Sequence, residues 1–281
     1  MSAFFGPGGN CELFRQSGGH STLDVPDFLR RLGLDAYEYE AGRGIGASAS
    51  MLAQLGLRAQ AANIRMSLHA PYFISLSGID PEKRLGSIRY IQESLDAARL
   101  IGASTVVVHA GSAGKISRTQ AMQLASDTLL RALDVVDTYG IAIGIETMGK
   151  KNQLGTLQEV IALCSLDNAF VPVVDFGHLN ARECGGVFRS AEDYYNVFYE
   201  IGDKLGDRVA KNLHCHFSRI EWTDAGERRH LTFSDTEYGP DFEPLCAMIA
   251  EHGFAPTIIC ESAGTQSADA IAMKRAYQQY Q

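Results

Sequence analysis

Imidazole and carboxylate side chains fall at the ends of successive short apolar runs in this sequence. In chain order these polar positions are His69, His109, Glu146, Asp175 with His178, His214 with His216, and Glu261. Each lies about one strand-and-helix unit after the one before it. If the runs are parallel strands of one barrel, all of these side chains reach the carboxyl-end rim, where the active sites of barrel enzymes lie.

Such a convergence of imidazoles and carboxylates predicts bound metal ions. Burying these polar groups together would cost several kcal/mol each unless a counter-charge neutralised them. The alternative, in which every group is satisfied by its own hydrogen bonds, suits a single strand histidine better than a whole series of strand ends. A site that mixes nitrogen and oxygen donors suits zinc, manganese or iron. We expect zinc, with manganese as the next choice.

Two short segments hold pairs of candidate ligands. In VVDFGHLN, Asp175 and His178 are three residues apart at a strand-to-loop corner, so they can reach one metal ion or two. In NLHCHFSR, His214 and His216 are two residues apart on one strand and therefore share a face. Both can point into the barrel, and the sequence leaves open which of the two is the ligand.

A polar loop is expected over EWTDAGERRH (221–230), and this loop ends in His230. We interpret His230 as a further metal ligand, with a solvated loop histidine as the alternative. The acids Glu221, Asp224 and Glu227 are candidate ligands close to it in the chain.

The rest of the sequence alternates β-type runs with amphipathic helical stretches. Several runs are almost continuous in Val, Ile and Leu, which is typical of parallel strands covered on both sides. The β-type runs are AYEYE (36–40), IRMSLHA (64–70), STVVVHA (104–110), IAIGIE (141–146), VPVVD (171–175), NLHCHF (212–217) and PTIICE (256–261), after a first strand near 2–5. Strand and helix repeated about eight times predict an α/β protein, a single (β/α)8 TIM barrel that spans residues 1–281 as one domain.

Composition restricts the class of partner. The net charge of −8 argues against a broad basic surface for nucleic acid, although bound metal ions would add positive charge that this count omits. The chain has no signal-like start and no apolar run of the roughly 20 residues that cross a bilayer. Its six cysteines form no CxxC pair and are expected to be free thiols. We expect a cytoplasmic protein with no membrane contact and no evident protein partner.

Several motifs, in this order, resemble a known family. They are SLHAPY (67–72), VVHAG (107–111), IETMGK (145–150), VDFGH (174–178), HCHFSR (214–219) and ICES (259–262). Together they resemble endonuclease IV, the second family of AP endonucleases, within the xylose-isomerase-like barrel superfamily. The shorter archaeal and firmicute members, described as deoxyribonuclease IV-like, are the most similar, since they also begin with an FGPxGN segment.

The resemblance implies a centre of two or three metal ions, zinc by preference with manganese or iron as alternatives. By motif, His69, His109 and Glu146 would hold the first ion. Glu146 would bridge to a second ion, held also by Asp175, His214 and Glu261, while His178 and His230 would hold a third. The implied activity is hydrolysis of the phosphodiester 5′ to an abasic site in damaged duplex DNA. Glu261 would orient or deprotonate the nucleophile, with Glu146 as the second catalytic carboxylate.

Two features depart from the bacterial members of that family. They carry an Asp-x-His pair at the third metal, whereas here the residue two before His230 is Arg228. Either Glu227 shifts its register to serve instead, or the third metal is weakly held. In addition, the loops that penetrate DNA have no clear match in GPGGN (6–10) or AGRGIG (41–46).

Other functions remain open at this point. A sugar or sugar-phosphate isomerase or epimerase on the same barrel would use two carboxylates for proton transfer, for which Glu146 and Glu261 qualify. A non-catalytic barrel that binds metal or a ligand is a third hypothesis. For substrate contacts we expect Arg219 to bind a phosphate, as an arginine can do with two parallel hydrogen bonds. Tyr72 is expected to stack on the substrate or hydrogen-bond to it.

Overall fold

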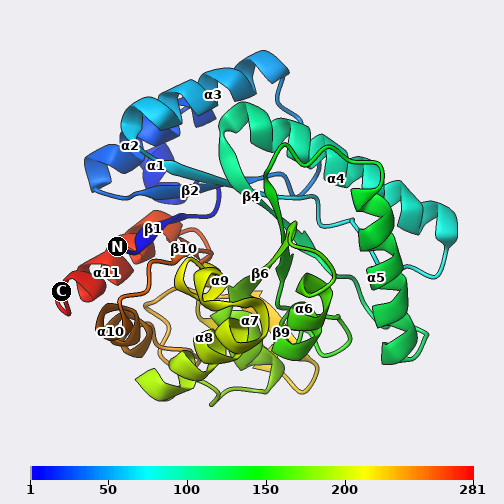
Figure 1. Cartoon of the computed structure of the whole chain (residues 1–281). Coiled ribbons are helices and arrows are strands. Elements are labelled where there is room, and N and C mark those ends of the chain that lie inside the picture. Colours follow the sequence, from blue (N-terminus) through cyan, green and yellow to red (C-terminus); the bar gives the residue numbers. More distant parts are fainter. Residues whose placement is uncertain (1) are drawn as a thin grey trace.

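Eight parallel strands form one sheet in the computed structural model, which describes residues 2–281 (Figure 1). The sheet order is β1 (Phe4–Pro7), β10 (Thr257–Cys260), β7 (His214–Phe217), β6 (Phe170–Asp175), β5 (Ala142–Glu146), β4 (Ala103–His109), β3 (Arg65–His69) and β2 (Ala36–Glu40). A parallel bridge between Gly8 and Glu38 joins the two ends of this order, so the sheet closes into a barrel. The predicted (β/α)8 barrel is confirmed.

Helices surround the strands on the outside (Figure 1). They are α1 (Glu12–Gln16), α2 (Val25–Leu32), α3 (Ala49–Ala62), α4 (Pro81–Ile101), α5 (Arg118–Leu133), α6 (Leu157–Cys164), α7 (Phe176–Arg182), α8 (Ala191–Leu205), α9 (Asp207–Lys211), α10 (Glu243–His252) and α11 (Gln266–Gln278). Because helices cover the sheet from outside, the strands bury both faces; in β4, Val106, Val107 and Val108 are almost fully inaccessible. None of the described helices is long and apolar enough to cross a membrane.

The expected polar loop over 221–230 is instead an antiparallel hairpin at the carboxyl-end rim. It consists of β8 (Ile220–Thr223) and β9 (Gly226–His230), joined by the two residues Asp224 and Ala225. Gly226 has a φ of 92°, a conformation that favours glycine, and this allows the chain to reverse there. The polar composition of the segment hid the strands, because β9 is largely polar and partly exposed and only the start of β8 is buried.

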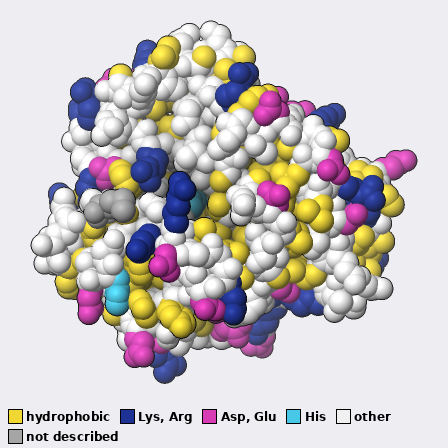
Figure 2. Space-filling view, in the orientation of Figure 1, with side chains coloured by type: hydrophobic (Ala, Val, Ile, Leu, Met, Phe, Trp, Pro, Cys, Tyr) yellow, Lys and Arg dark blue, Asp and Glu magenta, His cyan; other side chains and the backbone are white. Residues whose placement is uncertain are grey.

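Charges of both signs share the surface. On the face that Figure 2 shows, Lys and Arg side chains are interspersed with Asp and Glu side chains. The net charge of the whole chain is −8.

Candidate metal centre

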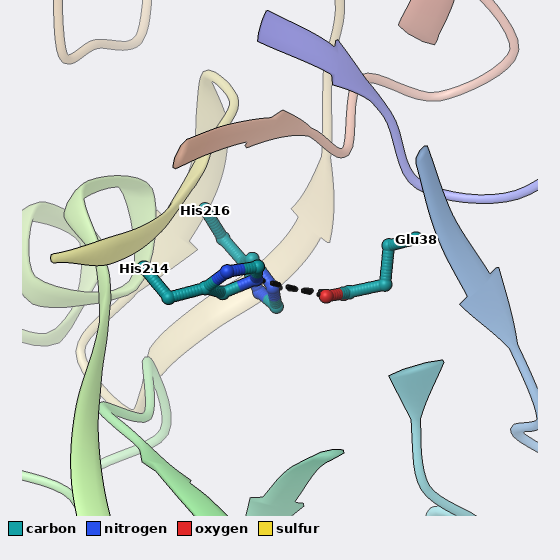
Figure 3. Close-up of side chains that lie close together, drawn as sticks. All are labelled: Glu38, His214 and His216. Carbon is teal, nitrogen blue, oxygen red and sulfur yellow. Dashed lines mark hydrogen bonds and ion pairs between the residues drawn. The ribbon is translucent and has the colours of Figure 1, made fainter. Parts of the chain in front are cut away.

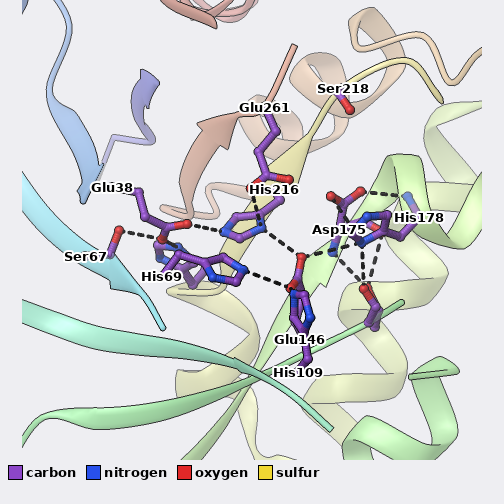
Figure 4. A network of polar contacts seen from close by, with 12 residues as sticks. Glu38, Ser67, His69, His109, Glu146, Asp175, His178, His216, Ser218 and Glu261 are labelled. Atoms are coloured by element: carbon purple, nitrogen blue, oxygen red, sulfur yellow. Dashed lines mark hydrogen bonds and ion pairs between the residues drawn. The ribbon is translucent and has the colours of Figure 1, made fainter. Parts of the chain in front are cut away.

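The first group of candidate ligands comes from three adjacent strand ends. His69 closes β3, His109 closes β4 and Glu146 closes β5, and the parallel register pairs His109 directly with Glu146. The Nε2 atoms of His109 and His69 lie 3.0 and 3.4 Å from the same oxygen, Glu146 Oε2 (Figure 4). His69 Nδ1 donates to the Ala70 carbonyl at 2.8 Å, so its Nε2 lone pair is free to face Glu146 and a metal ion. The structure thus brings these three predicted residues together.

The second group shares Glu146 with the first. His216 Nδ1 lies 3.0 Å from Glu146 Oε1 and 3.4 Å from Glu261 Oε1. Asp175 caps the N-terminus of α7, since its Oδ1 accepts from the backbone N–H of His178 at 2.7 Å. This hydrogen bond fixes the orientation of the Asp175 carboxylate, and its other oxygen, Oδ2, remains available to a ligand. Glu146, Asp175, His216 and Glu261 can each place a ligand atom within 4.8 Å of the others.

His214, the residue that the resemblance assigned to this second group, lies elsewhere. Both histidines of β7 point into the barrel, as expected for residues two apart. They differ in depth by about 6.6 Å, and only His216 is level with Asp175, its partner in the parallel register. His214 Nε2 instead lies 2.9 Å from Glu38 Oε2, deeper in the barrel (Figure 3). His216, not His214, therefore lies with Glu146, Asp175 and Glu261 in the second group, while His214 belongs to a separate group with Glu38 and His216.

The third group depends on a β-bulge. In a regular strand Glu227 and His230, three residues apart, would lie on opposite faces. The register of the hairpin shifts, because Glu221 pairs with Arg229 while Trp222 pairs with Glu227, which leaves Arg228 as an extra residue. Glu227 consequently joins His230 on one face, and its Oε2 lies 3.5 Å from His178 Nε2. The hairpin therefore has the register shift that Glu227 needs in order to join His230 in a third group.

Two supporting contacts position this third group. His178 Nδ1 donates to the Thr147 carbonyl at 2.9 Å, and His230 Nδ1 lies 2.8 Å from Ser218 Oγ. Gly149, after β5, makes room for Glu227: a Cβ at this position would lie 2.6 Å from the Glu227 Cβ and 2.8 Å from its Oε2. The backbone N–H of Glu227 also donates to the Gly149 carbonyl at 3.0 Å. The loop after β5 thus holds the hairpin at the rim.

Two carboxylates of β2 reach the same region and were not among the predicted residues. Glu38 is fully buried, and Glu40 lies near the rim, where its Oε2 accepts from the Tyr72 hydroxyl at 3.1 Å. Each can place an oxygen within 4.8 Å of a Glu261 oxygen. The sequence indicated that both acids share a face of the strand, because Glu38 and Glu40 alternate with aromatic residues in AYEYE (36–40).

Burial and neighbouring charges shift the pKa values of the carboxyl groups in this cluster. Burial opposes ionisation of Glu146, but contacts with His109, His178 and His216 hold its pKa well below the usual range. Burial raises the pKa of Glu261 to about 8, although the neighbouring His216 lowers it, and the negative charges of Glu146, Asp175 and Glu40 raise it further.

The donor set fits divalent transition-metal ions. Asp175 Oδ2 is buried and makes no hydrogen bond with any residue of the described range 2–281, so it is an acceptor in need of a cation. Each of the three groups combines imidazole nitrogen with carboxylate oxygen, the mixture that suits zinc, manganese or iron. Glu146 belongs to two groups and can bridge their ions.

Tyr72 lies over this cluster, at the mouth of the barrel. Its ring stacks on His109 with a centroid separation of 5.6 Å and an interplanar angle of 28°, and the residue is 57% exposed. A cavity of about 470 Å³ opens here, lined in part by Tyr72, Glu40, Arg43, His230 and Glu261. An exposed aromatic face beside an open cavity is available to a ligand, in agreement with the expected role of Tyr72.

Arg219, the expected phosphate-binding residue, contacts the chain itself. Its Nη1 donates to the carbonyls of Asp235 and Tyr238 at 2.8 and 3.1 Å, and its Nη2 pairs with the carboxylate of Asp241. These contacts hold the segment that follows the hairpin.

Comparison with known proteins supports the fold and the family. A family model described as xylose isomerase-like TIM barrel matches residues 26–277. The chain is 29% identical over 253 residues to an uncharacterized protein of Methanocaldococcus jannaschii, covering 89% of this chain and 90% of the relative. It is 35% identical over 166 residues to a probable endonuclease 4 of Acholeplasma laidlawii, covering 58% of this chain and 55% of the relative.

Two solved structures share the architecture. Endonuclease IV from Thermus thermophilus superposes with a TM-score of 0.69 at 18% identity, covering 92% of this chain and 94% of that one. A D-tagatose 3-epimerase-like protein superposes with a TM-score of 0.70, also at 18% identity, covering 99% and 96%. The two similar scores show a shared fold. With its closed barrel, its rim of ligands and the family match over residues 26–277, the chain belongs to the xylose isomerase-like TIM barrel family.

Proposed function

We propose that the protein is a metal-dependent phosphodiester hydrolase of the endonuclease IV type, which cleaves DNA 5′ to abasic sites. The observation that carries the proposal is the set of three adjoining ligand groups, two of which share Glu146. These groups would hold more than one ion, and several bound ions would supply the charge stabilisation that phosphoryl transfer requires, whereas a proton-transfer reaction on a sugar would need fewer. The similarity to probable endonuclease 4 sequences adds support.

In this proposal, the first ion would be held by His69, His109 and Glu146. The second would be held by Glu146, Asp175, His216 and Glu261, and the third by His178, Glu227 and His230. Zinc is the preferred ion, with manganese or iron as alternatives. When bound, such ions supply Lewis-acid activation of water and of the phosphate.

The chain's own residues then orient the reactants. Glu261 lines the cavity at the mouth, so its carboxylate can accept a hydrogen bond from the attacking water and take its proton. The exposed ring of Tyr72 can stack on a base or sugar beside the abasic site. With Arg219 engaged in contacts within the chain, the metal centre and the exposed Arg43 at the mouth would supply the positive charge for the phosphate.

The test is incision of a duplex that contains one tetrahydrofuran site by protein purified without chelator. Glu261→Gln is the matched control, because it keeps the shape of the side chain and removes its charge. Incision by the wild type well above this variant supports the hydrolase. Equal background cleavage by both proteins, with metal bound to the wild type, would contradict it.

A sugar or sugar-phosphate epimerase is the second candidate, and Glu40 is the observation that favours it. This carboxylate faces the mouth cavity, where it would repel a polyanion but could bind sugar hydroxyls. Metal stoichiometry separates the two functions: two or three ions per chain favour the hydrolase, and a single ion favours the epimerase. Exchange of the C–H proton of a ketose with solvent deuterium would identify the epimerase directly.

A further inference from the structure

A buried carboxylate joins the two histidines of β7 below the metal centre. Glu38 is fully inaccessible, and its Oε2 accepts hydrogen bonds from Ser67 Oγ at 2.7 Å and from His214 Nε2 at 2.9 Å. Its other oxygen, Oε1, lies 2.8 Å from His216 Nε2. Figure 3 shows the two imidazoles converging on this side chain from β7, and Figure 4 shows how it connects to the ligand groups.

His216 differs from the other candidate histidine ligands in the partner of its second nitrogen. His69 and His178 direct Nδ1 to backbone carbonyls, and His230 directs it to the Ser218 hydroxyl. His216 is reversed: Nδ1 faces Glu146 and Glu261, and Nε2 faces a carboxylate. His178 Nδ1 also lies 3.4 Å from carboxylate oxygens of Glu146 and Asp175, but both of these acids are themselves candidate ligands, whereas Glu38 lies below the three groups.

We propose that Glu38 is a positioning residue for the second metal ion, acting through His216. Nε2 of His216 and Oε1 of Glu38 are 2.8 Å apart as an ion pair without hydrogen-bond geometry, and the charge of Glu38 favours a proton on Nε2, which leaves the lone pair of Nδ1 for the ion. The charge of Glu38 also raises the donor strength of this ring, as outer carboxylates do for ligating histidines. A backbone carbonyl fixes the tautomer equally well but adds no charge. This inference rests on the proposed metal centre.

His214 and Ser67 complete the arrangement without being ligands. Both donate to Oε2 of Glu38, which holds the carboxylate in one orientation and leaves Oε1 for His216. This accounts for the second histidine of HCHF: His214 holds the carboxylate that supports the ligand. It also explains the acid at position 38, which would be costly in a barrel interior without these donors.

The experiment compares Glu38→Gln with the wild type and with Ser67→Ala as the matched control. Ser67→Ala removes one hydrogen bond to the same side chain but retains its charge, so it reports the effect of destabilisation alone. The readouts are release of metal to a chelator, resolved by equivalents, and the visible d–d spectrum of the cobalt-substituted protein. In Glu38→Gln we expect one equivalent to bind about 10–100-fold more weakly, with a changed cobalt band, while the other equivalents behave as in the wild type.

Three outcomes would overturn the inference. Glu38→Gln and Ser67→Ala could lower the melting temperature alike and leave metal release and the cobalt spectrum unchanged, which would mean a structural role alone. An additional equivalent of metal that is lost in both Glu38→Gln and His214→Asn would make Glu38 a ligand itself. A wild-type protein that binds no metal would contradict the proposed function as well, whereas the first two results contradict only this inference.

Discussion

Nε2 of His178 lies 3.5 Å from a carboxylate oxygen of Glu227. The β-bulge at Arg228 places Glu227 on the face of the hairpin that points to His178. Deleting Arg228 would restore regular pairing in the hairpin and leave Glu227 and His230 two residues apart, still on one face. We expect the deletion variant to keep its full metal content in elemental analysis, whereas Glu227→Ala should lose one equivalent, with the circular dichroism of the barrel unchanged in both. Arg228→Ala keeps the chain length and should also keep the full metal content. Loss of one equivalent from the deletion variant would show that the bulge itself is required.

Removal of the metal should lower the thermal stability. The cluster brings several buried carboxylates together, and a bound ion stabilises the folded state by mass action. At a free concentration about 100 times its Kd, one ion contributes about 2.7 kcal/mol. We expect scanning calorimetry to show a lower melting temperature after dialysis against a chelator and recovery after zinc is restored. Identical melting curves for the treated and untreated protein would contradict a metal centre of this kind.

Truncation of Tyr72 should weaken substrate binding and spare the metal. The ring is 57% exposed and stacks on His109 without being a ligand. Stacking of a base on an aromatic side chain contributes about 1–3 kcal/mol, so Tyr72→Ala should raise KM for abasic duplex by about 5–150-fold, with metal content unchanged. Tyr72→Phe keeps the ring and removes only the hydrogen bond to Glu40, so its KM should stay close to the wild-type value.

Replacement of Arg219 should affect stability rather than substrate binding. Its guanidinium donates to two carbonyls of the segment after the hairpin, and hydrogen bonds from charged groups contribute about 1.5–3 kcal/mol. Denaturant titration of Arg219→Ala should show a loss of that order, while KM stays within about twofold. A large rise in KM at unchanged stability would restore the phosphate-binding role.

Glu159 should make stability depend on pH in the acid range. Burial opposes its ionisation, but Arg118 and the backbone N–H groups of Gly155 and Thr156 outweigh burial and lower its pKa. Because the pKa is lower in the folded chain than in the unfolded chain, the stabilisation is complete above the unfolded value and is lost as pH falls through the folded value. The difference in melting temperature between the wild type and Glu159→Gln should thus shrink from neutral pH towards about pH 3. A constant difference would contradict this pKa shift.

The strand ends could be predicted from the sequence because they repeat. His69, His109, Glu146 and Asp175 each close a run that is apolar for reasons of burial alone, so a polar residue at that point stands out. Closure of the barrel then follows from topology, and closure brings the four side chains to one rim.

Contacts within the barrel were harder to predict. Periodicity places His214 and His216 on one face but does not show which of them is level with Asp175, because that depends on the register between β6 and β7. The bulge at Arg228 has no periodic signal in a short, exposed hairpin, although the spacing of Glu227 and His230 required it. Glu38 was missed because a buried acid is recognisable only once its donors are known.

Gly149 provides a simple criterion for reading related sequences. A Cβ there would lie 2.6 Å from the Glu227 Cβ and within 3.1 Å of Cδ2 of His178, so a related sequence with a larger residue at this position must shift its hairpin or draw Glu227 away from His178. The residue type at one position in the loop after β5 therefore indicates whether the third group of the proposed metal centre can form.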